Sequence, residues 1–326
     1  MSYKKLNNWA GWGIWAIATI VYLSTIEPTA SFWDCGEFIA SAYKLEVGHP
    51  PGAPFFMLLA RFLMVFSTPE TAAIFANALS ALSSSFTILF LFWSITHLAK
   101  KFTIGEAKSI SGAQTWAVLG SGAVGALAYT FSDSFWFSAV EGEVYALSSL
   151  FTALVFWAIL KWESVADEPG NLRWILLIAY LMGLSIGVHL LNLLAIPAIA
   201  LVFYFKRYEF SWKGILLTAV AAVALLGFIQ EGLIKGVVNL AGKFELFFVN
   251  DLAMAFNTGV VVYAVVLIAV LTLAIWWTQK RNGSWVSQGK PRGLMLLMGL
   301  FSMVIYLTEI TPWVRLCLGA VFCLDS

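Results

Sequence analysis

Charged side chains are scarce in this sequence, and their scarcity excludes an ordinary soluble domain. Only 11% of the 326 residues are Asp, Glu, Lys or Arg, whereas soluble domains carry about 25%. Hydrophobic residues make up 60%, which is more than a water-soluble core of this size can bury. A lipid bilayer can accommodate such a chain, so the composition predicts an integral membrane protein.

Cysteine and clustered basic residues are also few, and each absence excludes a class of protein. Cys35, Cys317 and Cys323 are too few and too far apart for a disulfide framework or a structural zinc site. The His and Asp spacing of a dedicated metal site is missing too, so we expect no divalent metal. The net charge is only +1 and no basic run is interleaved with aromatic residues, so we expect no nucleic-acid partner.

Long uncharged runs dominate the chain. Residues 72–99 contain no Asp, Glu, Lys or Arg, and about 20 apolar residues suffice for a helix to span a bilayer. We therefore expect an all-α polytopic membrane protein with about nine transmembrane helices. The expected spans are 10–26, 72–98, 115–131, 144–161, 174–188, 190–205, 213–230, 260–277 and 294–310.

The apolar segment 51–67 decides the topology, and we expect that it does not cross the membrane. Basic residues are enriched on the cytoplasmic side of membrane proteins. If 51–67 stays outside, 14 of the 19 basic residues face the cytoplasm, and 12 of those 14 would move outside if it crossed. The 14 are Lys4, Lys5, Lys100, Lys101, Lys108, Lys161, Arg173, Lys206, Arg207, Lys213, Lys280, Arg281, Lys290 and Arg292.

The same topology makes the outer face acidic, because 13 of the 18 acidic residues then lie there. We expect a cytoplasmic N-terminus in a bacterial inner membrane, with the outer loops in the periplasm. The longest outer loop would be 27–71 and the second longest 231–259. Loops of this size are usually functional, so the chemistry is expected in the first of them.

Two acids in the first outer loop are candidates for catalysis. Asp34 and Glu37 are three residues apart in a stretch that predicts a short helix at the membrane surface, so they share one face. One of the two carboxylates could act as a base. The alternative is structural, because Ser31 and Asp34 have the spacing of a helix capping box.

A proline turn and an arginine follow in the same loop. His49-Pro50-Pro51-Gly52 predicts a rigid turn that holds His49 beside the acidic helix, or a turn in which His49 is incidental. Arg61, in the apolar segment after the turn, could bind a lipid-linked phosphate through its guanidinium. It could equally extend to the lipid headgroups.

Further candidates come from later outer loops. Ser138 and Glu141 again have capping-box spacing, which favours a structural role for Glu141. Glu143 lies inside the first turns of an expected span, where a carboxylate needs a cation, a metal or burial in the protein. His189 lies at the junction of two spans on the same outer face, and Asn192 could orient its ring.

Taken together, these motifs resemble the GT-C superfamily of membrane glycosyltransferases. The closest resemblance is to the protein O-mannosyltransferase-related family classified as glycosyltransferase family 117. The matching stretches are Trp33-Asp34-Cys35-Gly36-Glu37-Phe38, His49-Pro50-Pro51-Gly52, Glu141-Gly142-Glu143-Val144-Tyr145-Ala146-Leu147 and Gly187-Val188-His189-Leu190-Leu191-Asn192. The resemblance implies a GT-C-like domain over 1–310, with two juxtamembrane helices in the catalytic loop 27–71. Residues 311–326 would be a short tail, the truncated or altered end of a longer protein.

The resemblance also implies a reaction. A hexose, with mannose expected, would pass from a polyprenyl-phosphate donor to Ser or Thr hydroxyls of an exported protein, with inversion at the anomeric carbon. Asp34 would be the catalytic base, and no cofactor other than this lipid-linked sugar is implied. The chain departs from the related protein O-mannosyltransferases at two places: Cys35-Gly36 separates the acids, and Ala53-Pro54 replaces a Leu-Gly-Lys continuation.

Two other functional classes stay open at this point. A transporter or flippase usually carries ionisable residues near the bilayer midplane. The expected spans lack them in their central thirds, which favours surface chemistry. A non-catalytic membrane subunit that binds the lipid carrier is compatible with the same sequence.

Overall fold

The computed structural model describes residues 2–49, 52–104 and 110–281, and every element in these ranges is a helix. The all-α prediction is thus confirmed for the part of the chain that is described. The chain divides into two compact units, Met1–Phe210 and Ser211–Ser326. The expected span 294–310 and the tail 311–326 lie outside the described residues.

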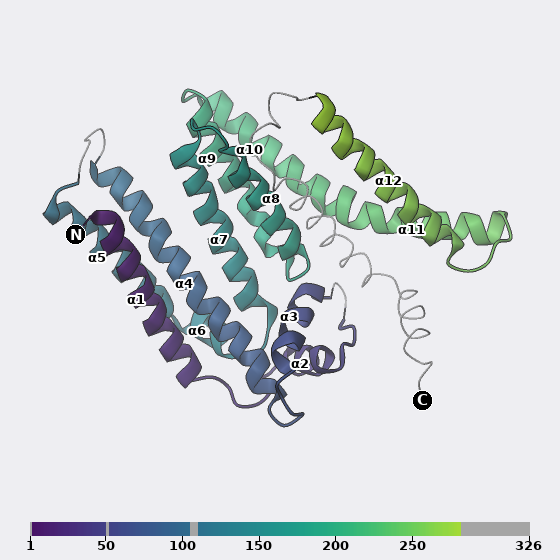
Figure 1. Cartoon of the computed structure of the whole chain (residues 1–326), viewed down its shortest axis with the longest axis horizontal. Helices are drawn as coiled ribbons and strands as arrows, with labels where there is room; N and C mark the ends of the chain where they lie inside the picture. The colour runs from purple at the N-terminus through teal and green to yellow at the C-terminus, as the bar shows by residue number, and fades with distance from the viewer. Residues whose placement is uncertain (1, 50–51, 105–109, 282–326) are drawn as a thin grey trace. The chain divides into compact units, whose positions relative to one another are not determined.

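The first unit is built around one long helix, α4 (Ala72–Ile104). This helix packs against α1, α5 and α7, and Figure 1 shows α1, α4 and α7 side by side. The other helices of the unit are α1 (Tyr3–Ser24), α2 (Cys35–Lys44), α3 (Pro54–Met64), α5 (Gly112–Thr130), α6 (Asp133–Val140), α7 (Val144–Val165), α8 (Leu172–Ile186), the 3-10 helix η1 (Leu190–Ala195) and α9 (Ile196–Arg207).

Small side chains let the neighbours of α4 approach closely. Ala76, Ser80 and Ser84 recur every four residues on α4, and all three are fully buried. On α5, a Cβ added to Gly122 would lie 2.4 Å from Cγ2 of Thr96, so only glycine fits at that crossing. Close approach at small residues is the usual means of helix association in membranes.

Within the described ranges, four helical segments are long and apolar enough to cross a membrane. They are Ala72–Ile104, Val144–Val165, Leu190–Arg207 and Trp212–Asp251. Each overlaps an expected span. Helices also occupy four other expected spans, as α1, α5, α8 and α12 (Thr258–Arg281), but over the described residues none of them combines the length and the hydropathy of a membrane span. The expected total of nine transmembrane helices therefore stays a prediction.

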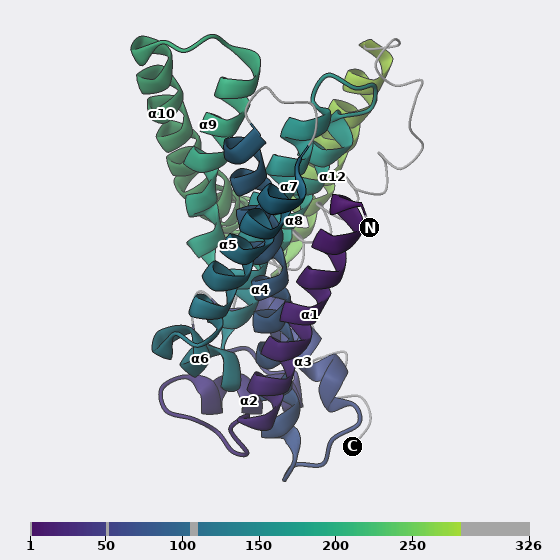
Figure 2. The same ribbon diagram turned by 90° about the vertical axis from the view of Figure 1, so that its left-hand side faces the viewer.

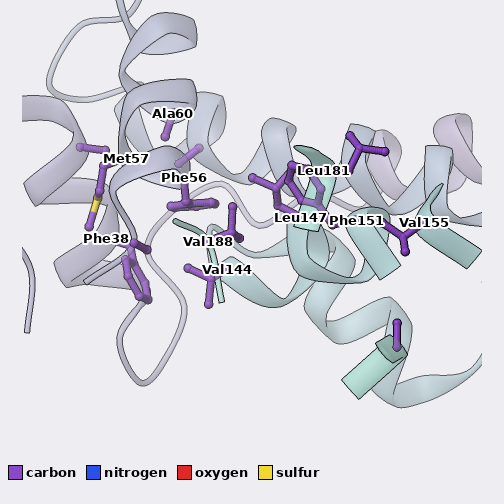
Figure 3. Packing of buried hydrophobic residues seen from close by; sticks show 14 of the residues in the cluster. Phe38, Phe56, Met57, Ala60, Val144, Leu147, Phe151, Val155, Leu181 and Val188 are labelled. Carbon is purple, nitrogen blue, oxygen red and sulfur yellow. The ribbon is translucent and has the colours of Figure 1, made fainter. Parts of the chain in front are cut away.

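Two short helices, α2 and α3, lie between α1 and α4, as the first outer loop predicted. At 11 residues, α3 is about 16 Å long, roughly half the thickness of the hydrocarbon core. Phe38 of α2 and Phe56 of α3 join Val144 and Val188 in one buried cluster, which Figure 3 shows from close by. Figure 2 shows α2 and α6 toward the end of the unit at which α4 begins.

The second unit corrects the expected outer loop 231–259. Residues Trp212–Asp251 form one continuous helical run, made of α10 (Trp212–Gly227), the π-helical η2 (Phe228–Lys235), α11 (Gly236–Leu246) and the π-helical η3 (Phe247–Asp251). Charged residues suggested a loop, but they do not prevent a helix. Glu231 and Lys235 form an ion pair of 2.6 Å one turn apart, which supports the helix locally.

Glu245 connects this run to α12. Its Oε1 accepts a hydrogen bond from the backbone N–H of Asn257 at 2.6 Å, and its Oε2 accepts one from Val260 at 3.0 Å. The carboxylate thus satisfies backbone donors at the N-terminus of α12, where negative charge is favourable. A structural role explains this acid without a functional site.

Candidate active site

Asp34 stands directly before α2 with its carboxylate free of the helix. It is the N-cap residue, yet its side chain makes no capping hydrogen bond and is 53% exposed. The alternative of a capping box formed with Ser31 is therefore wrong. Asp34 has helical angles, φ −84° and ψ −3°, rather than the extended conformation that a side-chain cap requires. Trp33, with a φ of 63°, turns the chain just before it.

Glu37 and His49 form the best-defined polar pair of the site. Glu37 Oε1 accepts a hydrogen bond from the backbone N–H of His49, and Oε2 lies 3.0 Å from His49 Nδ1. These bonds hold the pKa of Glu37 below its ordinary value, and the carboxylate in turn raises the pKa of His49. Gly48 makes the approach possible, because a Cβ there would lie 3.0 Å from Oε1 of Glu37.

His49 also faces Asp34, so the turn connects the two acids. Its Nε2 lies 3.9 Å from Oδ2 of Asp34, close enough for charge attraction but too far for a hydrogen bond. The structure thus brings Asp34, Glu37 and His49 together, as the sequence predicted. Pro50 and Pro51 of the predicted turn lie outside the described residues.

Three buried ionisable groups lie together at a second position, where α2 meets the segment between α6 and α7. Cys35, Glu141 and Glu143 are at most 8% exposed. Burial, with the nearby charges of Glu141 and Asp34, raises the pKa of Glu143 to about 7. Burial also raises the pKa of Glu141, although contacts with Ser31 and Cys35 lower it in part. The pKa of the Cys35 thiol rises to about 12, mainly because it is buried.

The expected capping box of Ser138 and Glu141 is also wrong. Ser138 lies inside α6, whose C-cap is Glu141, and α7 begins after its N-cap Glu143, so Ser138 does not begin a helix. Gly142, between the two acids, packs closely against α4. A Cβ on that glycine would lie 2.7 Å from Oδ1 of Asn77, so the Glu-Gly-Glu segment is pressed flat against α4.

Polar residues of α4 hold the outer loops in place. Asn77 Nδ2 donates to the carbonyl oxygens of Glu27 at 2.6 Å and Thr29 at 3.0 Å. Ser80 Oγ donates to the carbonyl of Glu143 at 3.4 Å. Because buried backbone carbonyls need partners, these bonds fix both loops to the same end of α4.

His189 occupies a third segment of the site. Its Nδ1 accepts a hydrogen bond from the backbone N–H of Leu191 at 3.1 Å, and its ring centroid lies 5.4 Å from that of Tyr145. Burial lowers the pKa of His189, which favours the neutral ring. With Nδ1 as acceptor, the proton of that neutral ring resides on Nε2, which can donate to a ligand.

The segment around His189 is joined to α3, but Asn192 does not orient the histidine ring. Phe55 N–H, in the first turn of α3, donates to the carbonyl of Gly187 at 2.7 Å. Asn192 is fully buried, and its Nδ2 donates to Ser185 Oγ at 2.7 Å. In the described contacts, the backbone N–H of Leu191 orients the ring of His189, a role that was expected of Asn192.

Arg61 is engaged away from the acids. Its Nη1 donates to the carbonyl of Tyr43 at 2.7 Å, and its guanidinium lies 5.3 Å from the centroid of the Tyr43 ring. Tyr43 is nine residues beyond Asp34 along α2, about 13 Å at the rise of a helix. Arg61 therefore ties α3 to α2, and its role at a phosphate stays a prediction.

Among the residues that the structure describes, two groups have the donor atoms that a divalent cation requires. One is Asp34, Glu37 and His49, and the other is Cys35, Glu141 and Glu143; in each, the donor atoms lie within 4.8 Å of one another. In the first group, Glu37 and His49 already satisfy each other. In the second, the thiol and the carboxyls have raised pKa values, so protons can offset their repulsion. The expectation of a metal-free site stays a prediction.

Sequence reasoning missed three residues that contact the site. Cys35 and Glu141 belong to the buried group, and the ring of Tyr145 lies beside that of His189. Glu141 was assigned to a cap, and Cys35 was weighed only as a disulfide or zinc residue. The available signal was position, because each lies next to a predicted site residue or in a motif with one.

Comparisons with known proteins identify a family that this chain matches. The family model described as the protein O-mannosyl-transferase TMEM260 N-terminal domain matches residues 34–212. The chain is 25% identical over 173 residues to protein O-mannosyl-transferase TMEM260 of Mus musculus, covering 53% of this chain and 22% of that protein. It is 24% identical over 222 residues to protein O-mannosyl-transferase tmem260 of Dictyostelium discoideum, covering 64% of this chain and 25% of that protein. The chain spans about a quarter of these relatives' length. No solved structure matches it.

Proposed function

The chain belongs to the family defined by the TMEM260 N-terminal domain of protein O-mannosyl-transferases, and from this premise we propose that it is a membrane glycosyltransferase. It moves a mannosyl group from a polyprenyl-phosphate donor to a Ser or Thr hydroxyl of an exported protein. Its site faces the periplasm of a bacterial inner membrane. The observation that carries the proposal is Asp34, an exposed carboxylate free of its helix and flanked by the bonded pair Glu37 and His49.

In the proposed reaction, Asp34 acts as the base. Its carboxylate takes the proton of the acceptor hydroxyl as that oxygen attacks the anomeric carbon from the face opposite the phosphate. The bond between the anomeric carbon and the phosphate oxygen breaks, the configuration inverts, and the polyprenyl phosphate leaves with the electron pair. Proton removal by a placed carboxylate contributes about 10²–10⁴-fold to such a rate.

The leaving phosphate requires positive charge or hydrogen-bond donors. His49 supports this role because Glu37 raises its pKa and so favours its cationic form. Neutral His189 offers Nε2–H as a donor. Glu37 uses both carboxylate oxygens on His49, so we assign it a positioning role. Arg61 holds α3 to α2 through Tyr43, and Asn192 holds η1 to α8 through Ser185, so both support the site indirectly.

An open groove supports a lipid-linked donor. It has a volume of about 690 Å³ and lies between α4, α5, α7 and η1, with Tyr145, Phe156 and Leu194 among its mainly apolar lining residues. Tyr145 connects it to the site, since its ring lies 5.4 Å from that of His189. Tyr145 and Phe156 are 11 residues apart on α7, which gives the groove a length of about 16 Å. A polyprenyl chain fits these properties.

A sugar-transfer assay tests the proposed function. The full chain in bilayers receives radiolabelled polyprenyl-phosphate mannose and an acceptor peptide containing Ser and Thr. We expect transfer by the wild type and a loss of about 10²–10⁴-fold in Asp34→Asn, which keeps the shape of the side chain but not its basicity. Glu70→Gln, an exposed change outside the site, should keep wild-type activity.

Two results would reject this function. One is transfer by Asp34→Asn at the wild-type rate, which removes the assigned base. The other is that the wild type binds the lipid-linked sugar without transferring it, or that it transports this sugar across the membrane of sealed vesicles. Those outcomes would indicate a lipid-carrier-binding subunit or a flippase instead.

A further inference from the structure

A second cavity lies far from the acidic site, at the end of the first unit where α1 begins and α4 ends. Its volume is about 1090 Å³, and α1, α4, α7 and α9 all contribute to its lining. Asn77, which holds the outer loops, and Lys100, which lines the cavity, are 23 residues apart on α4, or about 35 Å. The cavity is therefore separate from the proposed sugar-transfer site and does not depend on it.

Positive charge gathers in this cavity beyond what nearby acids neutralise. Five lysines line it: Lys4, Lys100, Lys101, Lys161 and Lys206. Lys101 pairs with Glu163, and Lys206 pairs with Asp167 at 2.6 Å.

The three other lysines have no carboxylate within 4.0 Å in the described part of the chain. Lys100 lies 4.8 Å from the centroid of the Tyr3 ring, and Lys161 lies 5.4 Å from that of Trp157. Aromatic rings relieve such charges only partly. Ammonium groups gathered in a partly buried cavity are stabilised by an anion among them.

The wall of the cavity is aromatic, which distinguishes it from a simple basic surface. Trp12, Trp93 and Trp157 form a continuous series, with ring centroids 6.0 Å apart from Trp12 to Trp93 and from Trp93 to Trp157. Trp12 is 44% exposed. Tryptophans prefer the boundary between lipid headgroups and acyl chains, so this wall suits the apolar part of an amphiphile.

Two polar atoms of residues that line the cavity have no hydrogen-bond partner in the described part of the chain. They are Oδ1 of Asn7 and Nε1 of Trp93, and both atoms are buried. Buried polar atoms are normally satisfied. A hydroxyl next to the anionic group of a ligand would supply the missing donor.

We propose that this cavity binds the phosphate group of an anionic phospholipid, with a hydroxylated headgroup such as that of phosphatidylglycerol. The ammonium groups of Lys4, Lys100 and Lys161 bind the phosphate, Asn7 accepts a hydrogen bond from the headgroup, and the acyl chains begin along the three tryptophans. The cavity lies at the end of the first unit that the distribution of basic residues assigns to the cytoplasm. Anionic lipids on that side of a membrane attract basic segments.

Lipid retention tests the proposal directly. The full chain is incubated with vesicles of phosphatidylglycerol or phosphatidylcholine, and bound lipid is counted by native mass spectrometry. We expect selective retention of phosphatidylglycerol, weakened about 30-fold in Lys100→Gln/Lys161→Gln. Lys5→Gln/Lys213→Gln removes the same charge from exposed positions outside the cavity and should bind as the wild type does.

Two further arms separate the alternatives. Lys100→Arg/Lys161→Arg keeps both charges and should retain the lipid, which distinguishes lost charge from lost folding. Equal retention of both lipids by the wild type, or equal weakening by the two Gln double variants, would overturn the site. Full competition by inorganic phosphate at the same phosphate concentration would overturn the assignment to a lipid and indicate a soluble phosphate ligand.

Discussion

At the scale of single residues, the two acids of the first outer loop have different surroundings. Glu37 uses both oxygens on His49, whereas Asp34 approaches His49 Nε2 no closer than 3.9 Å. Asp34 therefore keeps lone pairs for a substrate proton, and Glu37 fixes the histidine. Spacing along the helix alone would have made the two acids equivalent.

Replacing Glu37 should change how activity depends on pH. The wild-type rate should fall as pH rises through the raised pKa of His49, because the cation beside the leaving phosphate is then lost. Glu37→Gln removes the carboxylate that raises this pKa, so the alkaline limb of kcat/KM should move to lower pH. Measured pH profiles of both proteins check this.

A matched control for that profile is Glu46→Gln, an exposed change in the same loop. It should leave the alkaline limb where the wild type has it. An unchanged limb in Glu37→Gln would remove the positioning role of Glu37.

Glu143 gives a prediction on stability. Its pKa rises from 4.5 to about 7 on folding, so between these pH values the unfolded carboxyl ionises while the folded one keeps its proton. The folded state then loses stability as pH rises, by at most about 3 kcal/mol. Glu143→Gln cannot ionise, so thermal unfolding should show similar stability at pH 5 and a more stable variant at pH 8. An equal difference in stability between Glu143→Gln and the wild type at pH 5 and at pH 8 would contradict the raised pKa of Glu143.

The residues of the site were predictable to different degrees. Asp34, Glu37 and His49 lie within 16 residues of one another, so local motifs could place them together. Cys35 and Glu141 are separated by more than 100 residues, and tertiary contacts, such as the packing of Gly142 against Asn77, bring the second outer segment to α2. Contacts of that kind depend on tertiary structure, which local spacing cannot supply.

At the scale of elements, α3 contributes most to the assembly of the site. Phe56 is fully buried between α2 and the core, and Phe55 N–H is bonded to Gly187. Phe56→Ala should lower the free energy of unfolding by about 3–5 kcal/mol through loss of burial and a cavity. Phe62 on the same helix is 68% exposed, so Phe62→Ala should cost at most about 0.5 kcal/mol. Equal effects of the two changes on the melting temperature would contradict this packing.

Hydropathy predicted the helices correctly where a segment is both long and uncharged. The runs that became α4 and α7 are long and uncharged, and the proline-led segment became the short helix α3. The failure was 231–259, where Glu231, Lys235 and Glu245 indicated a loop. Those side chains are paired along the helix or cap α12, and a window that counts charge cannot detect such partners.

At the scale of the whole molecule, the two ends of the first unit carry opposite charge. Carboxylates gather where α4 begins, and unpaired lysines gather where it ends. With 33 residues, α4 is about 50 Å long, enough to exceed the roughly 30 Å hydrocarbon core. The acidic site and the basic cavity would then face opposite compartments, provided that α3 does not cross the bilayer.

Thiol labelling tests that arrangement most directly. Glu46→Cys and Lys101→Cys are introduced one at a time into a chain whose own cysteines are replaced by serine, and sealed right-side-out vesicles are treated with a membrane-impermeant maleimide. We expect Glu46→Cys to react in intact vesicles and Lys101→Cys to react only after the membrane is opened. Reaction of Lys101→Cys in intact vesicles would mean that α3 crosses the membrane, and the common outer site of Asp34, Glu143 and His189 would be contradicted.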